Sequence, residues 1–275
     1  MGTNGGYGYV QDGEGPAHEV VLSPFSISRH TVTNEQFAAF VAATGHRTEA
    51  EAYGWSFVFS GFLPDDFPTT RSVVGSPWWR RVEGADWAHP EGPDSTIDGR
   101  SEHPAVHISW SDALAFCDWS GTRLPTEAEW EFAARGGRSE RRFPWGDELE
   151  PGGQHRMNVF QGTFPRHNTV ADGYPGTAPV QAFAPNGFGL RQMTGNVWEW
   201  TADWFDRTYY AHSARRNPSG PGRGETRVMR GGSYLCHASY CNRYRVDARS
   251  SASPDSSTGN LGFRVARSPG LGLAA

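Results

Sequence analysis

The sequence predicts an α+β, loop-rich single domain with little regular secondary structure. Three short helix-start signals are separated by long stretches without periodicity. The 275 residues include 34 glycines and 19 prolines, together with 11 tryptophans, 16 phenylalanines and 9 tyrosines. Disordered chains lack aromatic residues, so these rings indicate an ordered core built from large side chains rather than from long helices. We expect one domain over residues 1–267 and a flexible C-terminal tail over residues 268–275.

Each of the three expected helices begins with a capping box, in which a Ser or Thr is followed three residues later by an acid or an amide. Apolar residues at helical spacing follow each box, and glycines at 45, 121 and 136 end the helices. The three boxes are Thr33 with Gln36, Ser109 with Asp112, and Thr126 with Glu129.

Short strands are expected at residues 18–27, where Pro24 interrupts the pattern, and at 103–109, 227–231 and 259–266. Residues 51–100 show almost no regular pattern, although they are rich in Trp and Phe. A structureless segment of this length inside a compact domain is uncommon and is often functional. We nevertheless expect most of its rings to lie in the core.

Composition narrows the class of partner and the compartment. The net charge of −5 argues against a nucleic-acid surface, and no apolar run approaches the roughly 20 residues that span a bilayer. No secretory leader or retention tetrapeptide is evident, and three cysteines are too few for a disulfide scaffold. We expect a cytoplasmic monomer without nucleic-acid or membrane partners.

Residues 231–245, GGSYLCHASYCNRYR, hold two of the three cysteines, Cys236 and Cys241. A local disulfide and a pair of inert buried thiols are both compatible with this spacing. The segment is not Cys-x-x-Cys, and it lacks the second Cys/His pair of a closed zinc site. Two thiolates suit a low-coordinate soft ion such as Cu(I), which leaves room for a substrate sulfur.

Several segments occur in an order that resembles the sulfatase-modifying factor fold, which is related to C-type lectins. The resemblance covers about residues 12–267, and the fold also hosts an iron-dependent sulfoxide synthase and non-catalytic binding modules. The cysteine segment narrows the resemblance to one subgroup, because this segment resembles the formylglycine-generating enzymes. The segments DGEGP, SFVF, PWW and HPEGPDS resemble the same enzymes. The fold-wide segments are EGPAHEV, VTNEQF, HPAVHISW, RLPTEAEWEFAARGG, FPWG, NGFGL, GNVWEW, RGGSY and GFRVAR.

This resemblance implies an oxidase that activates type I sulfatases. Such enzymes convert the cysteine of a Cys-x-Pro-x-Arg motif, in an unfolded sulfatase polypeptide, to Cα-formylglycine with O₂ and Cu(I). The resemblance implies that Cys236 and Cys241 hold Cu(I) in a nearly linear site and that the substrate thiolate joins them. The thioaldehyde that forms is hydrolysed to the aldehyde, with release of sulfide, and an external reductant is consumed. The alternatives are a non-catalytic peptide- or ligand-binding module and a relative of the iron enzyme.

Further site residues follow from the same resemblance. It implies that Ser233 lies beside the O₂ site and that His237 and Tyr240 line the pocket. Trp198 of GNVWEW corresponds to an aromatic wall near the substrate cysteine. Ser56 of SFVF and Trp78 of PWW correspond to the peptide groove.

The resemblance also implies two structural calcium sites. Oxygen donors on irregular backbone are what Ca²⁺ accepts, although scattered Asn, Asp and Glu in loops are more often solvated turn residues. The first site would use Asn158, the Val159 carbonyl, Asp172 and the Tyr174 carbonyl. The second would use Gln192, the Gly195 and Val197 carbonyls and Glu199.

The third cysteine, Cys117, lies on the face of the second expected helix. Secreted relatives have a disulfide-forming cysteine there, but Val265 occupies the region of the expected partner. We therefore expect Cys117 to be a free thiol, in keeping with a cytoplasmic location.

Overall fold

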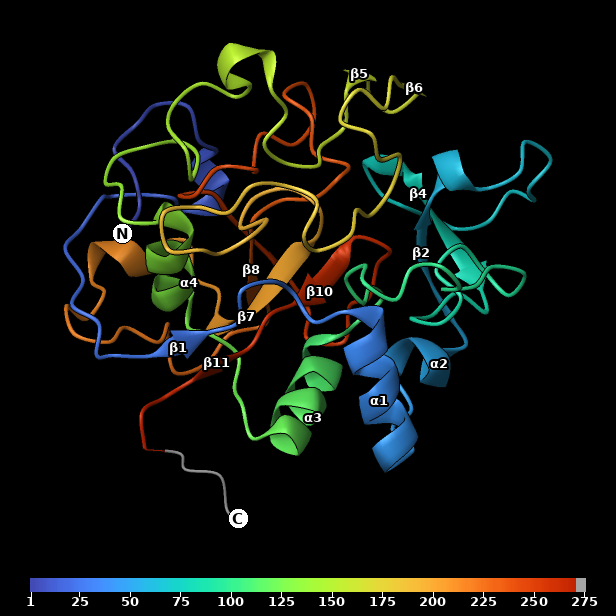
Figure 1. Ribbon diagram of the computed structural model, residues 1–275, viewed down its shortest axis with the longest axis horizontal. Coiled ribbons are helices and arrows are strands. Elements are labelled where there is room, and N and C mark those ends of the chain that lie inside the picture. The colour runs from blue at the N-terminus through green and yellow to red at the C-terminus, as the bar shows by residue number, and fades with distance from the viewer. Residues whose placement is uncertain (271–275) are drawn as a thin grey trace.

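Short helices and four small sheets make up the regular part of the computed structural model, which describes residues 1–270 (Figure 1). The α+β, loop-rich class expected from the sequence is confirmed. The helices are α1 (Asn34–Thr44), α2 (Glu49–Tyr53), α3 (Trp110–Ser120) and α4 (Glu127–Arg135).

All three predicted capping boxes are confirmed. Thr33 Oγ1 accepts a hydrogen bond from the backbone N–H of Gln36 at 3.2 Å, and Gln36 Oε1 accepts one from the backbone N–H of Thr33 at 3.0 Å. The same reciprocal pair begins α3 and α4, and Gly45, Gly121 and Gly136 end α1, α3 and α4 in the left-handed conformation. A fourth box, formed by Thr48 and Glu51, begins α2, which the sequence analysis did not predict.

The central sheet has the strand order β10, β7, β8, β9, and it carries the predicted site. β10 runs parallel to β7, and the other pairs are antiparallel. The expected strand at 227–231 is confirmed as β8, whereas the expected strand at 259–266 divides between two sheets, as β10 and β11. The strands are β7 (Trp198–Trp204), β8 (Arg227–Arg230), β9 (Arg249–Ala252) and β10 (Leu261–Phe263), with β11 (Ala266–Arg267) paired to β1 (Ser26–Ile27).

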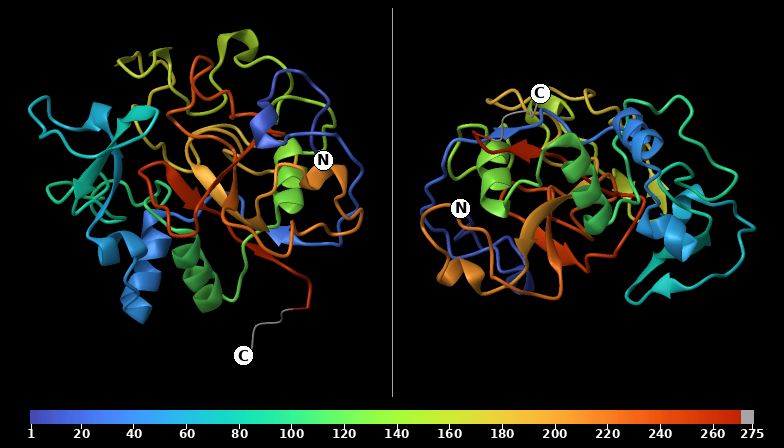
Figure 2. Two further views of the ribbon diagram at one scale, coloured as in Figure 1. Left: turned by 180° about the vertical axis from the view of Figure 1, so that it is seen from behind. Right: turned by 90° about the horizontal axis from the view of Figure 1, so that it is seen from below.

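A second sheet occupies the region that was expected to lack regular structure, so that prediction was wrong. Its order is β2 (Trp55–Phe59), β4 (Ser76–Glu83), β3 (Ser72–Val73), all antiparallel. Ser56 and Val58 are buried while Trp55 and Phe57 are half-buried, which is the alternation of a strand. Frequent Gly and Pro around this sheet hid the pattern. Figure 2 shows the sheet at one end of the molecule, away from α4 and the N-terminal segment.

Two further strand predictions were wrong. Residues 103–109 form no strand, because His107 takes a left-handed φ of 58° and breaks the extended backbone. The segment is held instead by single backbone bonds, such as Ala105 N–H to the Val32 carbonyl at 3.0 Å. Of the strand expected at 18–27, only Ser26–Ile27 pairs in a ladder. Residues 143–185 contain a short 3-10 helix, Pro151–Gly153, and the short hairpin of β5 (Gly162–Thr163) and β6 (His167–Asn168).

The core is built from aromatic rings, as the composition predicts. Phe37 packs edge-on against Phe40 and Trp87, with ring centroids 5.4 Å and 5.3 Å apart, and Phe116 joins the same cluster.

In the described part of the chain, no helix is long and apolar enough to cross a membrane. At the start of the expected tail, Ser268 Oγ accepts a hydrogen bond from Arg123 Nε at 2.9 Å, and residues 271–275 lie outside the described residues.

Buried arginines form a second, polar framework on either side of the cysteine segment. Arg249 donates to both carboxylate oxygens of Glu127, from Nε at 2.8 Å and from Nη2 at 2.7 Å. A single nitrogen of Arg245, Nη2, donates to both oxygens of Glu14 at 2.7 Å and 2.8 Å. Arg230 reaches Glu131 at 2.7 Å. All three guanidinium groups are almost completely buried, so their pairing replaces the hydration that they lose. These pairs fix the backbone on both sides of the two cysteines.

Candidate active site

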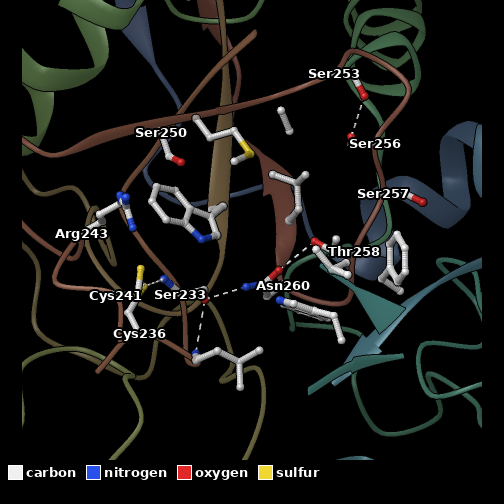
Figure 3. Close-up of a pocket in the computed structure, with 18 of the residues that line it drawn as sticks. Ser233, Cys236, Cys241, Arg243, Ser250, Ser253, Ser256, Ser257, Thr258 and Asn260 are labelled. Carbon is white, nitrogen blue, oxygen red and sulfur yellow. Dashed lines mark hydrogen bonds between the residues drawn. The ribbon is translucent and has the colours of Figure 1, made fainter. Parts of the chain in front are cut away.

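Cys236 and Cys241 lie at one end of a pocket of about 690 Å³ (Figure 3). Their sulfur atoms are 2.8 Å apart, and both thiols are free and buried. Consecutive turns bring them together, because Cys236 N–H binds the Ser233 carbonyl and Cys241 N–H binds the His237 carbonyl, both at 2.8 Å. Gly232 permits this path: its φ is 72°, and a Cβ there would lie 3.0 Å from Tyr244 Cα.

The two thiols differ in acidity. Burial raises the pKa of Cys236, and the hydrogen bond between the sulfurs raises it further. The hydrogen bond from Cys236 lowers the pKa of Cys241, against the effect of burial, and the positive charge of Arg243 lowers it further. Cys241 is therefore the first of the pair to become a thiolate.

Ser233 is placed beside the sulfurs by a short polar chain. Its backbone N–H points to Cys236 Sγ at 3.4 Å, and its Oγ accepts a hydrogen bond from Asn260 Nδ2 at 2.8 Å. The Asn260 carbonyl in turn accepts from Trp198 N–H at 2.8 Å. Asn260 was missed by the sequence analysis, because a lone Asn in a predicted strand gives no signal.

Aromatic residues form the walls near the sulfurs. Trp198, on β7, and Tyr240, in the cysteine segment, both line the pocket as predicted. Tyr240 stacks on Phe164 with a centroid distance of 4.4 Å and meets the edge of Trp78 at 4.6 Å. Trp78 therefore supports Tyr240 from behind, and its neighbour Trp79 lines the pocket instead.

Ser56 and His237 do not line the pocket. Ser56 is fully buried behind the pocket wall, where its Oγ lies 2.8 Å from His107 Nδ1 and 3.0 Å from the Ser257 carbonyl. It therefore positions Ser257, which does line the pocket. His237, which was predicted to line the pocket, is not among its lining residues: it is half-buried and forms a 2.8 Å hydrogen bond with Ser239 Oγ.

The wall opposite the sulfurs is made by Tyr53, β2 and the loop that follows β9. Its side chains are aromatic, small or hydroxylic. Among residues 1–270, only Arg243 and Asp255 bring charged side chains to the pocket lining. Neither was predicted, since charge in a loop usually means solvent exposure. The residues of this wall are Tyr53, Trp55, Phe57, Ser253, Asp255, Ser256, Ser257 and Thr258, and Ser250 and Ala252 of β9 also line the pocket.

The four residues of the first expected calcium site lie together. The Asp172 carboxylate accepts hydrogen bonds from Val159 N–H at 3.1 Å and from Tyr174 N–H at 3.0 Å. Asn158 is fully buried, and its Oδ1 has no hydrogen-bond partner within the described residues. An unpaired buried amide oxygen, on the residue before Val159, whose N–H contacts a carboxylate, fits a hard cation.

The second expected calcium site is less favourable. Gln192 Oε1 is likewise buried and unpaired in the part of the chain that the structure describes. Both oxygens of Glu199, however, are bound by Arg264 at 2.6 Å and 2.7 Å, and Trp130 Nε1 donates to one of them at 2.6 Å. The only carboxylate of this set is therefore already neutralised, and calcium there stays a prediction.

Comparison with known proteins identifies the family. The sulfatase-modifying factor enzyme 1-like domain matches residues 1–269. A formylglycine-generating enzyme of Streptomyces coelicolor is 58% identical over 98% of this chain and 87% of its own, and one of Mus musculus is 54% identical over 93% and 69%. The inactive Cα-formylglycine-generating enzyme 2 of Mus musculus is 45% identical over 98% of this chain and 83% of its own.

A solved structure agrees with the sequence matches. PvdO from Pseudomonas aeruginosa is 27% identical, with a TM-score of 0.69 over 97% of this chain and 89% of that one. Because relatives include an inactive enzyme, family membership alone does not decide activity. The family match over almost the whole chain, together with these identities, shows that the chain belongs to the sulfatase-modifying factor family of formylglycine-generating enzymes.

Proposed function

We propose that this chain is a copper-dependent oxidase that converts the cysteine of a Cys-x-Pro-x-Arg motif in an unfolded sulfatase to Cα-formylglycine. The observation that carries the proposal is the pair of free thiols, 2.8 Å apart, at the inner end of an open aromatic pocket. Buried thiols with only a packing role need no such access. The relatives named formylglycine-generating enzymes support the sulfatase substrate.

The overall reaction balances with one external reductant. Oxidation of the substrate C–H and S–H bonds removes two electrons and two protons and leaves a thioaldehyde. O₂ takes those electrons and two more from the reductant, with four protons in all, and becomes two waters. One water then replaces sulfur at the thioaldehyde carbon, which gives the aldehyde and hydrogen sulfide.

Cys236 and Cys241 are the residues that would hold Cu(I), since thiolates are its preferred ligands. When bound, the ion would supply one-electron chemistry with O₂ and a coordination position for the substrate thiolate. The chain's own residues prepare the site around it. Burial excludes water, the charge of Arg243 favours the thiolate form of Cys241, and Asn260 fixes the Ser233 hydroxyl beside Cys236.

The pocket is suited to an extended peptide. Aromatic side chains of β2 and β4 line it together with the loop after β9, and about 690 Å³ is within the usual range for a ligand site. We also propose one structural Ca²⁺ at Asn158 and Asp172, supported by the unpaired Asn158 oxygen. The buried free thiol of Cys117 supports a reducing, cytoplasmic location.

The test is turnover of a synthetic Cys-x-Pro-x-Arg peptide with Cu(I), a reductant and air. Mass spectrometry should show the aldehyde and its hydrate, and sulfide should accumulate in equal amount. Peptide that stays unchanged, while the protein is folded and copper-loaded, would instead favour a non-catalytic peptide-binding module on the same fold.

A further inference from the structure

The two charged side chains of the pocket lining lie at opposite ends of the pocket. Arg243 is beside the sulfurs, where its guanidinium is also bound to Asp12, with Nη2 3.1 Å from Oδ1. Asp255 belongs to the loop after β9, and Figure 3 shows Ser253, Ser256 and Ser257 of that loop far from Cys236. Because Asp12 neutralises Arg243, the charge that the described pocket lining presents without an ion pair is the negative charge of Asp255.

Asp255 is surrounded by groups that suit a guanidinium ligand. Tyr53 Oη donates to its Oδ2 at 3.1 Å, and the side chain is otherwise exposed. The Tyr53 ring stacks with Trp55 at 6.3 Å, and Trp55 also lines the pocket. The guanidinium of Arg81 already lies over the Trp55 ring, 4.6 Å from its centroid, so this surface accepts a planar cation. A carboxylate beside aromatic faces is a common receptor for arginine.

We propose that Asp255 receives the arginine of the Cys-x-Pro-x-Arg motif and thereby fixes the direction of the bound peptide. This inference rests on the proposed function. The cysteine lies at the sulfur pair, and the four following residues run toward the loop after β9. Four extended residues span roughly 13 Å, which separates the two ends of the motif enough to engage two distinct ends of a pocket. A pair of sulfurs at one end and a negative charge at the other discriminate between the two peptide directions.

The first experiment is a double-mutant cycle in kcat/KM. Wild type and Asp255→Asn are compared on the Arg peptide and on the same peptide with citrulline, which keeps the shape but removes the charge. We expect Asp255→Asn to lower kcat/KM for the Arg peptide by on the order of tenfold to hundredfold, which is the effect of losing a charged hydrogen bond. The same substitution should lower kcat/KM for the citrulline peptide much less. Asp98→Asn, an exposed carboxylate outside the pocket, is the matched control.

A second readout separates recognition from chemistry. A fluorescent peptide with Ser in place of Cys cannot be oxidised, and its Kd is measured by anisotropy on the same variants. Asp255→Lys should bind the peptide with Glu in place of Arg more tightly than wild type does. This reversal cannot come from simple damage to the loop.

The outcomes distinguish the two proposals. Equal kcat/KM and equal Kd for wild type and Asp255→Asn, while wild type still prefers Arg to citrulline, would overturn the assignment of Asp255. Absence of turnover with an intact Asp255-dependent preference in Kd would support the assignment and contradict the oxidase. Wild-type protein that shows no preference for Arg in either readout would also overturn it.

Discussion

The two walls of the pocket are held in different ways. The wall that carries Cys236 and Cys241 is fixed by buried ion pairs, with Arg245 on Glu14 and Arg249 on Glu127 at 2.7 Å. The opposite wall is fixed by uncharged contacts. His107, Ser56 and Ser257 form a buried chain of hydrogen bonds of 2.8 to 3.0 Å behind it.

This difference matches the two tasks that we assign to the walls. A pair of sulfurs that shares one ion needs a fixed separation, and bidentate ion pairs specify geometry closely. A wall that accepts varied peptide residues needs only shape and a few polar groups. Substitutions in the two walls should therefore affect different properties of the protein.

Removing either sulfur should abolish the reaction. We expect Cys236→Ser and Cys241→Ser each to lose turnover and Cu(I) uptake, because a hydroxyl is a poor ligand for a soft ion. Copper content after gel filtration and peptide turnover are the measurements. Cys117→Ala, which removes the third cysteine from the core, is the control and should keep both. Normal turnover in either serine variant would show that the sulfur wall is assigned wrongly.

Breaking the charged framework should cost stability. Arg249→Met leaves a buried Glu127 with one guanidinium fewer, and we expect a loss of about 3–5 kcal/mol in the free energy of unfolding. Urea denaturation measures this loss. Arg215→Met, which removes an exposed pair with Glu19, should cost about 0–1 kcal/mol. Similar losses in the two variants would mean that burial of the ion pairs does not fix this wall.

The uncharged wall should respond to acid through His107. Burial lowers the pKa of this histidine to about 4, against 6.5 in the unfolded chain. Between these values the unfolded state binds more protons, so stability is present above pH 6.5 and falls as the pH drops toward 4, by about 3 kcal/mol in total.

His107→Asn removes that titration, and Asn tolerates the left-handed backbone at this position. The difference in unfolding free energy between wild type and this variant should therefore narrow as the pH falls from 7 to 4. A difference that is constant with pH would contradict a neutral buried His107.

The smallest effect is expected at Ser56. Ser56→Ala removes hydroxyl contacts to His107 and Ser257 and should cost about 1 kcal/mol of stability. Because the sulfurs are untouched, Cu(I) uptake should be normal while KM for the peptide rises. Loss of Cu(I) uptake would show that the two walls are not independent.

Local signals in the sequence predicted the helices, but not the second sheet or the ion pairs. A capping box lies within four residues, so the box formed by Thr126 and Glu129 can be recognised from the sequence alone. The pairing of β2 with β4 joins residues 20 or more positions apart, and Arg245 with Glu14 joins opposite ends of the chain. Such partners are chosen by tertiary packing, which one sequence does not display.

Within the site, too, local contacts could be predicted from the sequence and contacts between distant residues could not. Cys236 and Cys241 are five residues apart, and their proximity follows from local turns. Asn260 and Asp255 reach the pocket only because β10 pairs with β7 and the loop after β9 faces β2. The family resemblance predicted that Ser56 and Trp78 lie in the peptide groove, and the structure puts both one layer behind the pocket lining.

X-ray absorption of the Cu(I)-loaded protein tests whether Cys236 and Cys241 hold the ion and whether the substrate adds a third sulfur. We predict an inner shell made only of sulfur, with two sulfurs in the resting protein and a third after the Cys-x-Pro-x-Arg peptide is added. A shell that contains nitrogen or oxygen ligands in place of the two cysteine sulfurs, or one that is unchanged by a saturating amount of peptide, would contradict the account.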